Sequence, residues 1–316
     1  MSEPDVPSLT ALPPAARLAL NLPGFGTFFK PDELHRVVEA AQILESAGAD
    51  ELVMPDHVVM GGRTDRYPYG TFPYPAELPW LEALTTLAAI AGATTTVGLH
   101  TGILVVPLRP APLLAKTAAT IDVGSRGRLS LGVGAGWQIE EFDASGIPFE
   151  KRGQILNDTI GACRSLWGPS PSSFSSPTVN FDGIFCEPSP VRPGGIPVLF
   201  AGKLNGRTVR RIVEMGNGWH PPVGMAPDDI ARGVEQLRVA YGDAGRLSAE
   251  VMVHHSLAPV RVDGAVDLNA TMVSASALAS AGVTTLSMGI ASIAGTPDAL
   301  EPATHRVVDA FRSAIG

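Results

Sequence analysis

Eight short apolar runs, each followed by a stretch of helical periodicity, constrain the fold of this chain more than any other feature. The apolar runs occupy residues 17–22, 51–55, 96–106, 128–135, 196–202, 218–222, 251–260 and 284–290. The helical patterns occupy residues 31–48, 80–92, 110–127, 149–167, 206–216, 226–242, 266–281 and 298–314. Eight strand–helix units predict an α/β protein with a (β/α)8 barrel, and a doubly wound open sheet is the alternative. The nearly continuous apolar strands fit a parallel sheet that is buried on both faces.

The length of 316 residues is compatible with one barrel domain. Length alone suggests about two domains, but α/β barrels of about 250 residues are a standing exception. No inter-domain linker is visible, so we predict a single domain over residues 1–316, with residues 1–15 flexible. Residues 58–78 and 168–195 exceed ordinary loop length. We expect both to be insertion loops on the C-terminal face of the barrel.

Charge and composition exclude several classes of partner. The net charge of −8 disfavours binding to nucleic acid, which favours a basic face. The N-terminus has neither the basic start nor the apolar segment of a signal peptide, and no apolar run reaches the length of a membrane helix. The two cysteines, Cys163 and Cys186, are predicted to be free thiols in a reducing compartment. We therefore expect a soluble cytoplasmic protein without a membrane partner.

Polar residues stand where several predicted strands end, and this is the face where barrel enzymes place their active sites. His57 follows the second strand directly and is preceded by Asp56, so it is the candidate acid–base residue. Other histidines lie on later strands, at His100, His220 and the pair 254–255. A barrel hydrolase could gather such histidines around zinc. We expect no metal site, because the first strand offers no ligand and the HExxH spacing is absent.

Glycines interrupt two of the predicted strands. Gly102 stands in the middle of "VGLHTGILVVPLRP" (97–110), and "GVGAGW" (132–137) ends the fourth strand. Glycine in a strand indicates a bulge or a close approach of the backbone to a ligand. The fourth strand leads into an irregular stretch rather than a helix, so it is not a nucleotide fingerprint. Two interpretations stay open for it: close packing inside the barrel, or a floor for a flat ring.

The segment "AGKLNGRTVRRIVEMGNGW" (201–219) combines a strand end with the start of a helix. Asn205 is a good helix cap, and the N–H groups of a first helical turn can bind an anion. Lys203 and Arg207 add positive charge. A phosphate group would fit here, and an ordinary capped helix with solvated basic residues is the alternative.

With these segments assembled, the chain resembles the bacterial luciferase-like superfamily, and within it the deazaflavin-dependent oxidoreductases of actinobacterial type. The matching segments are residues 48–59, 97–137, 141–153 and 196–219. The resemblance implies a barrel that holds a flavin or deazaflavin ring across its C-terminal face. It places a non-proline cis peptide at Gly102–Ile103, the active-site histidine at His57 and the phosphate of the cofactor tail at the turn 202–207. The implied cofactor-binding residues are Asp56, Thr101, Gly102, Ile103, Gly134, Ala135, Gly136, Trp137, Gly202, Lys203, Asn205, Gly206 and Arg207.

Departures from the pattern bear on the cofactor and the substrate. Ala135 stands where related sugar-phosphate dehydrogenases carry a glutamate and where luciferase carries an arginine that helps to hold the FMN phosphate. The aromatic residue that those dehydrogenases place soon after the histidine is also missing from "DHVVMGG". We therefore expect coenzyme F-420 rather than FMN, and a substrate that is not a sugar phosphate. The substrate-pocket candidates are Phe25, Tyr67, Tyr69, His100 and His220.

The resemblance implies an oxidoreductase that transfers a hydride between coenzyme F-420 and a small organic substrate. The alternatives are an FMNH2-dependent monooxygenase, with a separate reductase supplying the reduced cofactor, and a cofactor-binding protein without turnover. The resemblance also implies a homodimer built through early barrel helices. The apolar helix at 80–92 is compatible with this, although a helix that faces the core has the same pattern.

Overall fold

The computed structural model describes residues 16–23, 28–68 and 70–315, and the eight predicted strands close into a parallel barrel. In chain order they are β1 (Arg17–Asn21), β2 (Glu51–Met54), β3 (Gly98–Val105), β4 (Leu129–Gly134), β7 (Val198–Ala201), β8 (Gly218–His220), β9 (Met252–Ser256) and β12 (Thr285–Gly289). Neighbours around the barrel follow the order β1-β12-β9-β8-β7-β4-β3-β2. The (β/α)8 prediction is confirmed, and each predicted run contains one strand.

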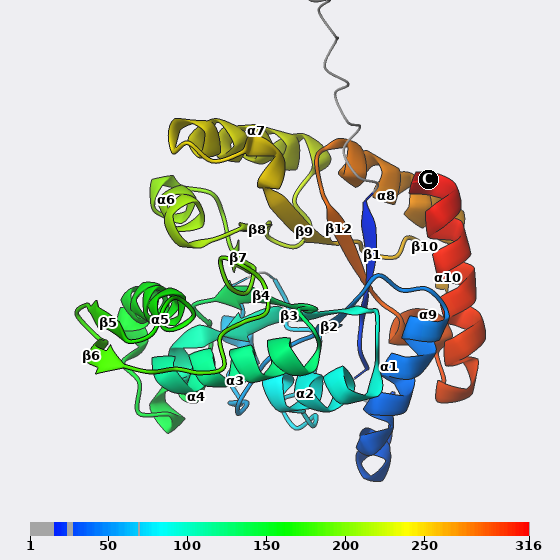
Figure 1. Cartoon of the computed structure of the whole chain (residues 1–316). Helices are drawn as coiled ribbons and strands as arrows, with labels where there is room; N and C mark the ends of the chain where they lie inside the picture. Colours follow the sequence, from blue (N-terminus) through cyan, green and yellow to red (C-terminus); the bar gives the residue numbers. More distant parts are fainter. Residues whose placement is uncertain (1–15, 24–27, 69, 316) are drawn as a thin grey trace, which may run out of the picture.

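Helices cover the outside of the barrel (Figure 1). They are α1 (Val37–Ser46), α2 (Ala83–Ala93), α3 (Ala111–Gly124), α5 (Arg152–Leu166), α6 (Gly206–Met215), α7 (Pro227–Asp243), α8 (Leu268–Ser280) and α10 (Leu300–Ile315). Two short helices, α4 (Ile139–Ala144) and α9 (Ala291–Ala294), and several single 3-10 turns complete the helical structure. No helix within the described residues is long and apolar enough to cross a membrane.

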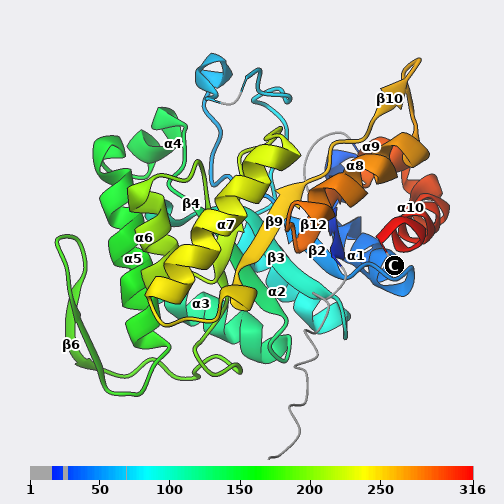
Figure 2. The same ribbon diagram turned by 90° about the horizontal axis from the view of Figure 1, so that it is seen from above.

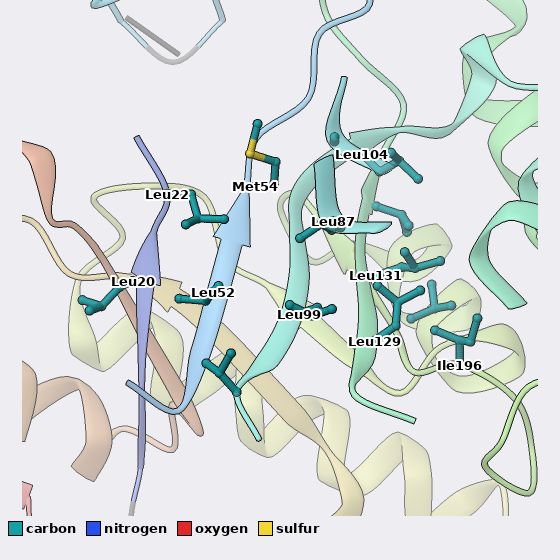
Figure 3. Packing of buried hydrophobic residues seen from close by; sticks show 14 of the residues in the cluster. Leu20, Leu22, Leu52, Met54, Leu87, Leu99, Leu104, Leu129, Leu131 and Ile196 are labelled. Carbon is teal, nitrogen blue, oxygen red and sulfur yellow. The ribbon is translucent and has the colours of Figure 1, made fainter. Parts of the chain in front are cut away.

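The hydrophobic core lies between the barrel and its helices. Strand side chains alternate between the two faces of a sheet, and the outward set is aliphatic. Figure 3 shows Leu52 and Met54 of β2, Leu99 of β3 and Leu131 of β4 packed in this layer, with Leu87 of α2 among them. Each of these side chains is at most 1% exposed. Burial on this scale contributes about 1.5–3 kcal/mol for each side chain, so this layer drives barrel formation.

The interior of the barrel is polar, in contrast to the outer layer. The inward set includes Glu51, His100, Ser130, His220, His254, Thr285 and Ser287, and all seven are buried. Glycines share this inward face: Gly98, Gly132 and Gly218 each stand two residues from a polar member of the set on β3, β4 and β8. Barrel interiors are usually filled with valine, isoleucine and leucine. The polar filling of this barrel therefore needs a chemical explanation.

The two long connections lie at opposite ends of the barrel. Residues 58–78 follow β2 and lie at the carboxyl ends of the strands, as predicted. Residues 168–195 connect α5 to β7, so they lie at the other end, and the prediction that they cover the C-terminal face is wrong (Figure 2). They also contain an antiparallel hairpin of β5 (Ser172–Ser175) and β6 (Asn180–Ile184). The N–H of Val191 binds the Asp122 carboxylate at the end of α3, which fixes this segment there.

A second small hairpin, β10 (Arg261–Val262) with β11 (Ala265–Val266), follows β9. The predicted run 251–260 therefore covers one barrel strand and the start of this connection. The expected flexible segment 1–15 lies outside the described residues.

Candidate active site

A cavity of about 520 Å³ opens at the carboxyl ends of the barrel strands. This volume is in the range of small-molecule and cofactor sites. One side is apolar and aromatic, formed by Val53, Pro55, Tyr67, Phe72, Pro73, Tyr74, Trp80, Ile103, Val105, Ala135 and Trp137. The other side carries the polar residues Asn21, His220, His254, Ser256 and Ser287. The cavity therefore offers an apolar wall to a ring and hydrogen-bonding groups to its edge.

Glycine backbone forms the surface between these two sides. The peptide bond between Gly102 and Ile103 is cis, as the sequence analysis predicts, and the register of β3 against β4 shifts between Thr101 and Leu104. A Cβ atom on Gly102 would lie 2.4 Å from Cγ1 of Val53, and one on Gly134 would lie 3.0 Å from Cγ2 of Ile103. Gly136 has a φ of +79°. A side chain would not fit at Gly102 or Gly136 and would be crowded at Gly134, so the backbone at these positions stays accessible to a flat ligand.

His57 is held by a buried carboxylate. Its Nδ1 lies 3.2 Å from Oε2 of Glu141, which α4 supplies and which is 0% exposed. Oε1 of Glu141 accepts hydrogen bonds from the backbone N–H groups of Val58 at 2.6 Å and Val59 at 3.4 Å. A carboxylate accepts hydrogen bonds and cannot donate them, so Nδ1 of His57 donates to Oε2 of Glu141. The lone pair then lies on Nε2.

Aromatic rings surround the His57 imidazole. The ring centroid of Trp80 lies 4.9 Å away, that of Trp137 lies 6.0 Å away and that of Phe72 lies 6.2 Å away. Tyr67 packs against Trp137 at 5.1 Å. Trp80, which follows the 58–78 connection, therefore gives His57 an aromatic neighbour that the segment directly after it lacks. Phe25 and Tyr69, two predicted pocket residues, lie outside the described residues.

Asp56 lines the cavity, but its carboxylate oxygens serve the protein itself. Oδ1 and Oδ2 each accept a hydrogen bond from Arg109 at 2.8 Å, and Oδ2 also accepts from the N–H of Val105 at 2.9 Å. Arg109 also binds Glu82 at 2.6 Å. Burial would lower the pKa of Arg109, but the Asp56 and Glu82 carboxylates raise it above its usual value. Asp56 thus holds the β3–α3 turn against β2 and positions His57 next to it.

The predicted phosphate turn lies at the edge of the cavity. Gly202 lines the cavity, and Lys203, Asn205, Gly206 and Arg207 are exposed beside it. Asn205 caps α6 as predicted, because its Oδ1 accepts hydrogen bonds from the N–H groups of Arg207 and Thr208, both at 3.0 Å. Two N–H groups of the first turn are therefore already bound. An anion here would depend on the remaining N–H groups and on the two basic side chains.

Three histidines meet beneath the cavity. Nε2 of His100 lies 2.9 Å from Nε2 of His220, and Nδ1 of His100 lies 2.7 Å from Oγ of Ser130. The ring of His254 lies against both, with centroids 4.5 Å and 4.3 Å away. Nε2 of His254 lies 3.2 Å from Oε1 of Glu51. The cluster fills the inside of the barrel directly below the ligand-sized space.

Burial controls the charge of this cluster. Desolvation, with His254 close by, lowers the pKa of His100 to about 3, and desolvation holds the pKa of His220 well below its usual range. Burial by itself would raise the pKa of Glu51, but His100, His254 and Arg17 lower it to about 2. At neutral pH the cluster therefore combines neutral imidazoles at His100 and His220 with an ionised carboxylate.

Two predicted site residues lie below the cavity rather than along its surface. His100 is 1% exposed and bonded to Ser130 and His220, so it is the hydrogen-bonded side chain of the barrel interior that was the alternative to a pocket residue. Thr101 is 0% exposed, and its hydroxyl donates to the carbonyl of Gly132 at 2.9 Å. Its side chain therefore does not face a cofactor. Both residues lie on the regular part of β3, before the register shift that begins after Thr101.

The structure also gives roles to residues that are absent from the predicted site. Glu141 and Trp80 flank His57, and Arg152 lines the cavity from the start of α5. Asn21 and His254 line its polar side. The "EF" at 141–142 lies within a segment that carried the resemblance, and it was the one signal that pointed to Glu141. Arg152 lies in the same matching segment, 141–153, Trp80 ends the aromatic stretch 67–80, and His254 belongs to the pair 254–255 at a strand end, whereas no local pattern indicated Asn21.

A family model described as luciferase-like monooxygenase matches residues 11–280. An uncharacterized protein of Mycobacterium tuberculosis is 30% identical over 248 residues, which cover 78% of this chain and 79% of that protein. The pyrimidine monooxygenase RutA of Serratia proteamaculans is 28% identical over 177 residues, or 52% of this chain and 46% of that protein. Among solved structures, an F420-dependent secondary alcohol dehydrogenase in complex with an F420-acetone adduct has a TM-score of 0.75 at 17% identity, covering 94% of this chain and 99% of that one.

Proposed function

The chain belongs to the luciferase-like monooxygenase family, and we propose that it is an oxidoreductase that transfers a hydride between coenzyme F-420 and a small organic substrate. The observation that carries the proposal is the glycine-floored cavity with the His57–Glu141 pair at its edge. The alcohol dehydrogenase of similar fold, whose structure contains an F420-acetone adduct, supports the choice of cofactor.

The residues of the cavity fit a flat tricyclic ring. A Cβ would clash with Val53 at Gly102 and would be crowded by Ile103 at Gly134, and with glycine at both positions the backbone stays open to a ring face. The buried Oδ1 of Asn21 has no hydrogen-bond partner among the described residues, and Asn21 lines the polar side of the cavity. An unpaired buried acceptor calls for a donor on a bound molecule or an ordered water. The edge of a deazaflavin ring carries such N–H groups.

When bound, coenzyme F-420 supplies or accepts the hydride, and the protein supplies orientation and electrostatics. His57 handles the accompanying proton. For reduction of a carbonyl, the protonated His57 donates the proton on Nε2 to the substrate oxygen. For oxidation of an alcohol, the neutral ring takes that proton back at the same atom. Glu141 stabilises the protonated imidazole and keeps Nε2 turned away from the carboxylate.

Trp80, Phe72 and Trp137 form an apolar wall around the proton-transfer group. Such a wall excludes water from the substrate and strengthens the His57–Glu141 interaction. The aromatic wall favours a small substrate with an apolar body and one oxygen atom that reaches His57. Arg152 also lines the cavity, stacks on Phe149 with its guanidinium carbon 3.9 Å from the ring centroid, and offers one positive charge.

An FMNH2-dependent monooxygenase is the second candidate. Its support is the family description and the similarity to a pyrimidine monooxygenase. Ala135 lines the cavity without a charged group, and this favours F-420 over a cofactor held by an arginine at that position. In the monooxygenase case a separate reductase would supply the reduced cofactor.

Cofactor titration separates the two candidates. Apoprotein is titrated with oxidised F-420 and with FMN, and binding is followed by fluorescence. We expect saturable binding of F-420 and much weaker binding of FMN. Tight FMN binding without a response to F-420 would overturn the proposal. Oxygen uptake with reduced FMN and a panel of substrates would then support the monooxygenase.

A pair of variants tests the role of His57. His57→Gln should bind F-420 as the wild type does but lose about 10²–10⁴-fold in turnover. His305→Gln is the matched control, because His305 is exposed on α10 and remote from the cavity. The expected homodimer and the cytoplasmic location stay predictions, and sedimentation analysis tests the first.

A further inference from the structure

Three imidazoles in the barrel interior bring ring nitrogens close to one another. One ligand atom from each of His100, His220 and His254 lies within 4.8 Å of the other two. They come from β3, β8 and β9, so residues more than a hundred positions apart converge there. Three histidines with an open position form a donor set that binds zinc in enzymes, and imidazole also suits copper, iron and nickel.

A buried ring nitrogen without a hydrogen-bond partner indicates that this cluster binds a further polar group. Nδ1 of His254 has no hydrogen-bond partner among the described residues, although the side chain is only 2% exposed. Its other nitrogen, Nε2, faces Oε1 of Glu51 at 3.2 Å, so the missing partner is the one for Nδ1. Buried polar atoms without partners are rare, and each calls for a water, an ion or a ligand.

The outer nitrogens of two rings already have the partners that metal ligands use. Nδ1 of His100 lies 2.7 Å from Oγ of Ser130, which leaves Nε2 for an ion. Nε2 of His254 lies beside the Glu51 carboxylate, which leaves Nδ1. A metal-bound histidine almost always donates its other N–H to a carboxylate, a carbonyl or a water, and this contact orients the ring.

Space for the cluster is provided by one glycine. A Cβ on Gly132 would lie 2.7 Å from Nε2 of His100 and 3.0 Å from Nε2 of His220. The negative charge of the buried Glu51 also favours a cation here. Nη1 of its ion-pair partner Arg17 lies 3.5 Å from Oε2, and the Arg17 side chain is half exposed, so it compensates that charge only in part. A cation among the three rings would lie close to this carboxylate in a region of low dielectric.

We propose that His100, His220 and His254 bind one divalent transition-metal ion, with Glu51 and Ser130 orienting the ligands. His220 and His254 also line the cavity, so the ion enters from there and keeps a coordination position open toward it. An oxygen atom of a cavity-bound molecule can occupy that position. Neither the hydride transfer proposed above nor the role of His57 depends on this ion.

Binding requires a small rearrangement of the rings. Metal–nitrogen bonds of about 2.0–2.1 Å at tetrahedral angles place two ligand nitrogens roughly 3.3 Å apart. The Nε2 atoms of His100 and His220 are 2.9 Å apart and share a proton. When the ion binds, that proton moves to Nδ1 of the ring that carried it, and the pair opens by a few tenths of an ångström. The His254 ring, stacked on His100 at an interplanar angle of 16°, must turn to direct Nδ1 at the ion.

Metal uptake by the full chain tests the proposal without any cofactor or activity. The protein is treated with a chelator, desalted and titrated with ZnCl2 or CoCl2. Elemental analysis after a second desalting should find one ion per chain, and Co²⁺ should develop the visible absorption of a tetrahedral nitrogen site. The thermal unfolding midpoint should rise with free metal concentration, as expected for binding to the native state alone.

Matched variants identify the ligands. His254→Gln should lose stoichiometric binding and the Co²⁺ spectrum, whereas Glu51→Gln should weaken binding by about 10–100-fold. His255→Gln is the control, because the next residue of β9 faces the outer layer with Val253 and should bind as the wild type does. No ion retained by the folded wild type, or equal retention by His254→Gln, overturns the proposal. Loss of binding in His255→Gln alone would also overturn it.

Discussion

Replacing Glu141 by glutamine tests whether the buried carboxylate sets the tautomer of His57. Glutamine has nearly the same shape, and its oxygen can still accept the N–H of Val58, which lies 2.6 Å from Oε1 in the wild type. Its amide NH2 group then faces Nδ1 of His57, where Oε2 stands at 3.2 Å. Two donors cannot share that contact, so Nδ1 must become the acceptor and the ring proton must move to Nε2.

The magnitude follows from what the carboxylate provides. A hydrogen bond to a charged group contributes about 1.5–3 kcal/mol, so we expect a loss of about 2 kcal/mol in the free energy of unfolding. For the reaction, Nε2 would lose its function as a base and the protonated ring would lose its counter-charge. General acid–base catalysis contributes about 10²–10⁴-fold, and a loss in this range is expected for Glu141→Gln.

Long-range ¹H–¹⁵N spectra of the histidine side chains measure the tautomer directly, and His57→Gln assigns the signal. At neutral pH the wild type should show the Nδ1–H form and Glu141→Gln the Nε2–H form. Glu140→Gln is the matched control, because the Glu141 carboxylate, not that of its neighbour, contacts His57. The reasoning is refuted if Glu141→Gln keeps the Nδ1–H form in a folded protein, or if the wild type already carries its proton on Nε2.

Three further predictions concern stability. Gly132→Ala would place a Cβ 2.3 Å from the carbonyl oxygen of Thr101, so denaturant titration should show a free energy of unfolding lower by about 1–3 kcal/mol. Gly62→Ala is the control, because there is open space around Gly62 and the free energy of unfolding should change little. Burial alone would raise the pKa of Glu45, but hydrogen bonds from the N–H groups of Thr95, Thr96 and Val97 at 2.6–3.0 Å lower it. The resulting stabilisation is present above the unfolded pKa of about 4.5 and is lost as the pH falls through the lowered value. In acid titrations, the stability of Glu45→Gln should therefore depend less on pH below 4.5 than that of the wild type. Arg128 donates hydrogen bonds to four backbone carbonyls and to the Thr94 hydroxyl, so Arg128→Lys should lower the free energy of unfolding measured by calorimetry by about 2–4 kcal/mol. Arg238→Lys, at an exposed position, is the control, and equal stability of the two variants would contradict the prediction.

Local patterns were sufficient for the barrel. Each strand carries an aliphatic outward face, such as Leu52 and Met54 on β2, and each helix carries a stripe that covers it. Strand and helix periods are read within a dozen residues, and eight repeats of them leave few ways to close a parallel sheet. Local signals also placed His57 at a strand end and Asn205 at a helix start. The segment 168–195 was misplaced because loop length says nothing about the end of the barrel at which a loop emerges, whereas its position between α5 and β7 does.

The sequence by itself determined the barrel, the glycines that keep its mouth open and the histidine at the end of β2. Only the tertiary structure decided which side chains meet. Glu141 reaches His57 from α4, 84 positions away, and Trp80 reaches it from the end of a long connection. His100, His220 and His254 converge because barrel closure brings β3, β8 and β9 around one axis and alternation turns these residues inward. The count of histidines was visible in the sequence, but their convergence depends on strand register, which is set by packing across the whole barrel.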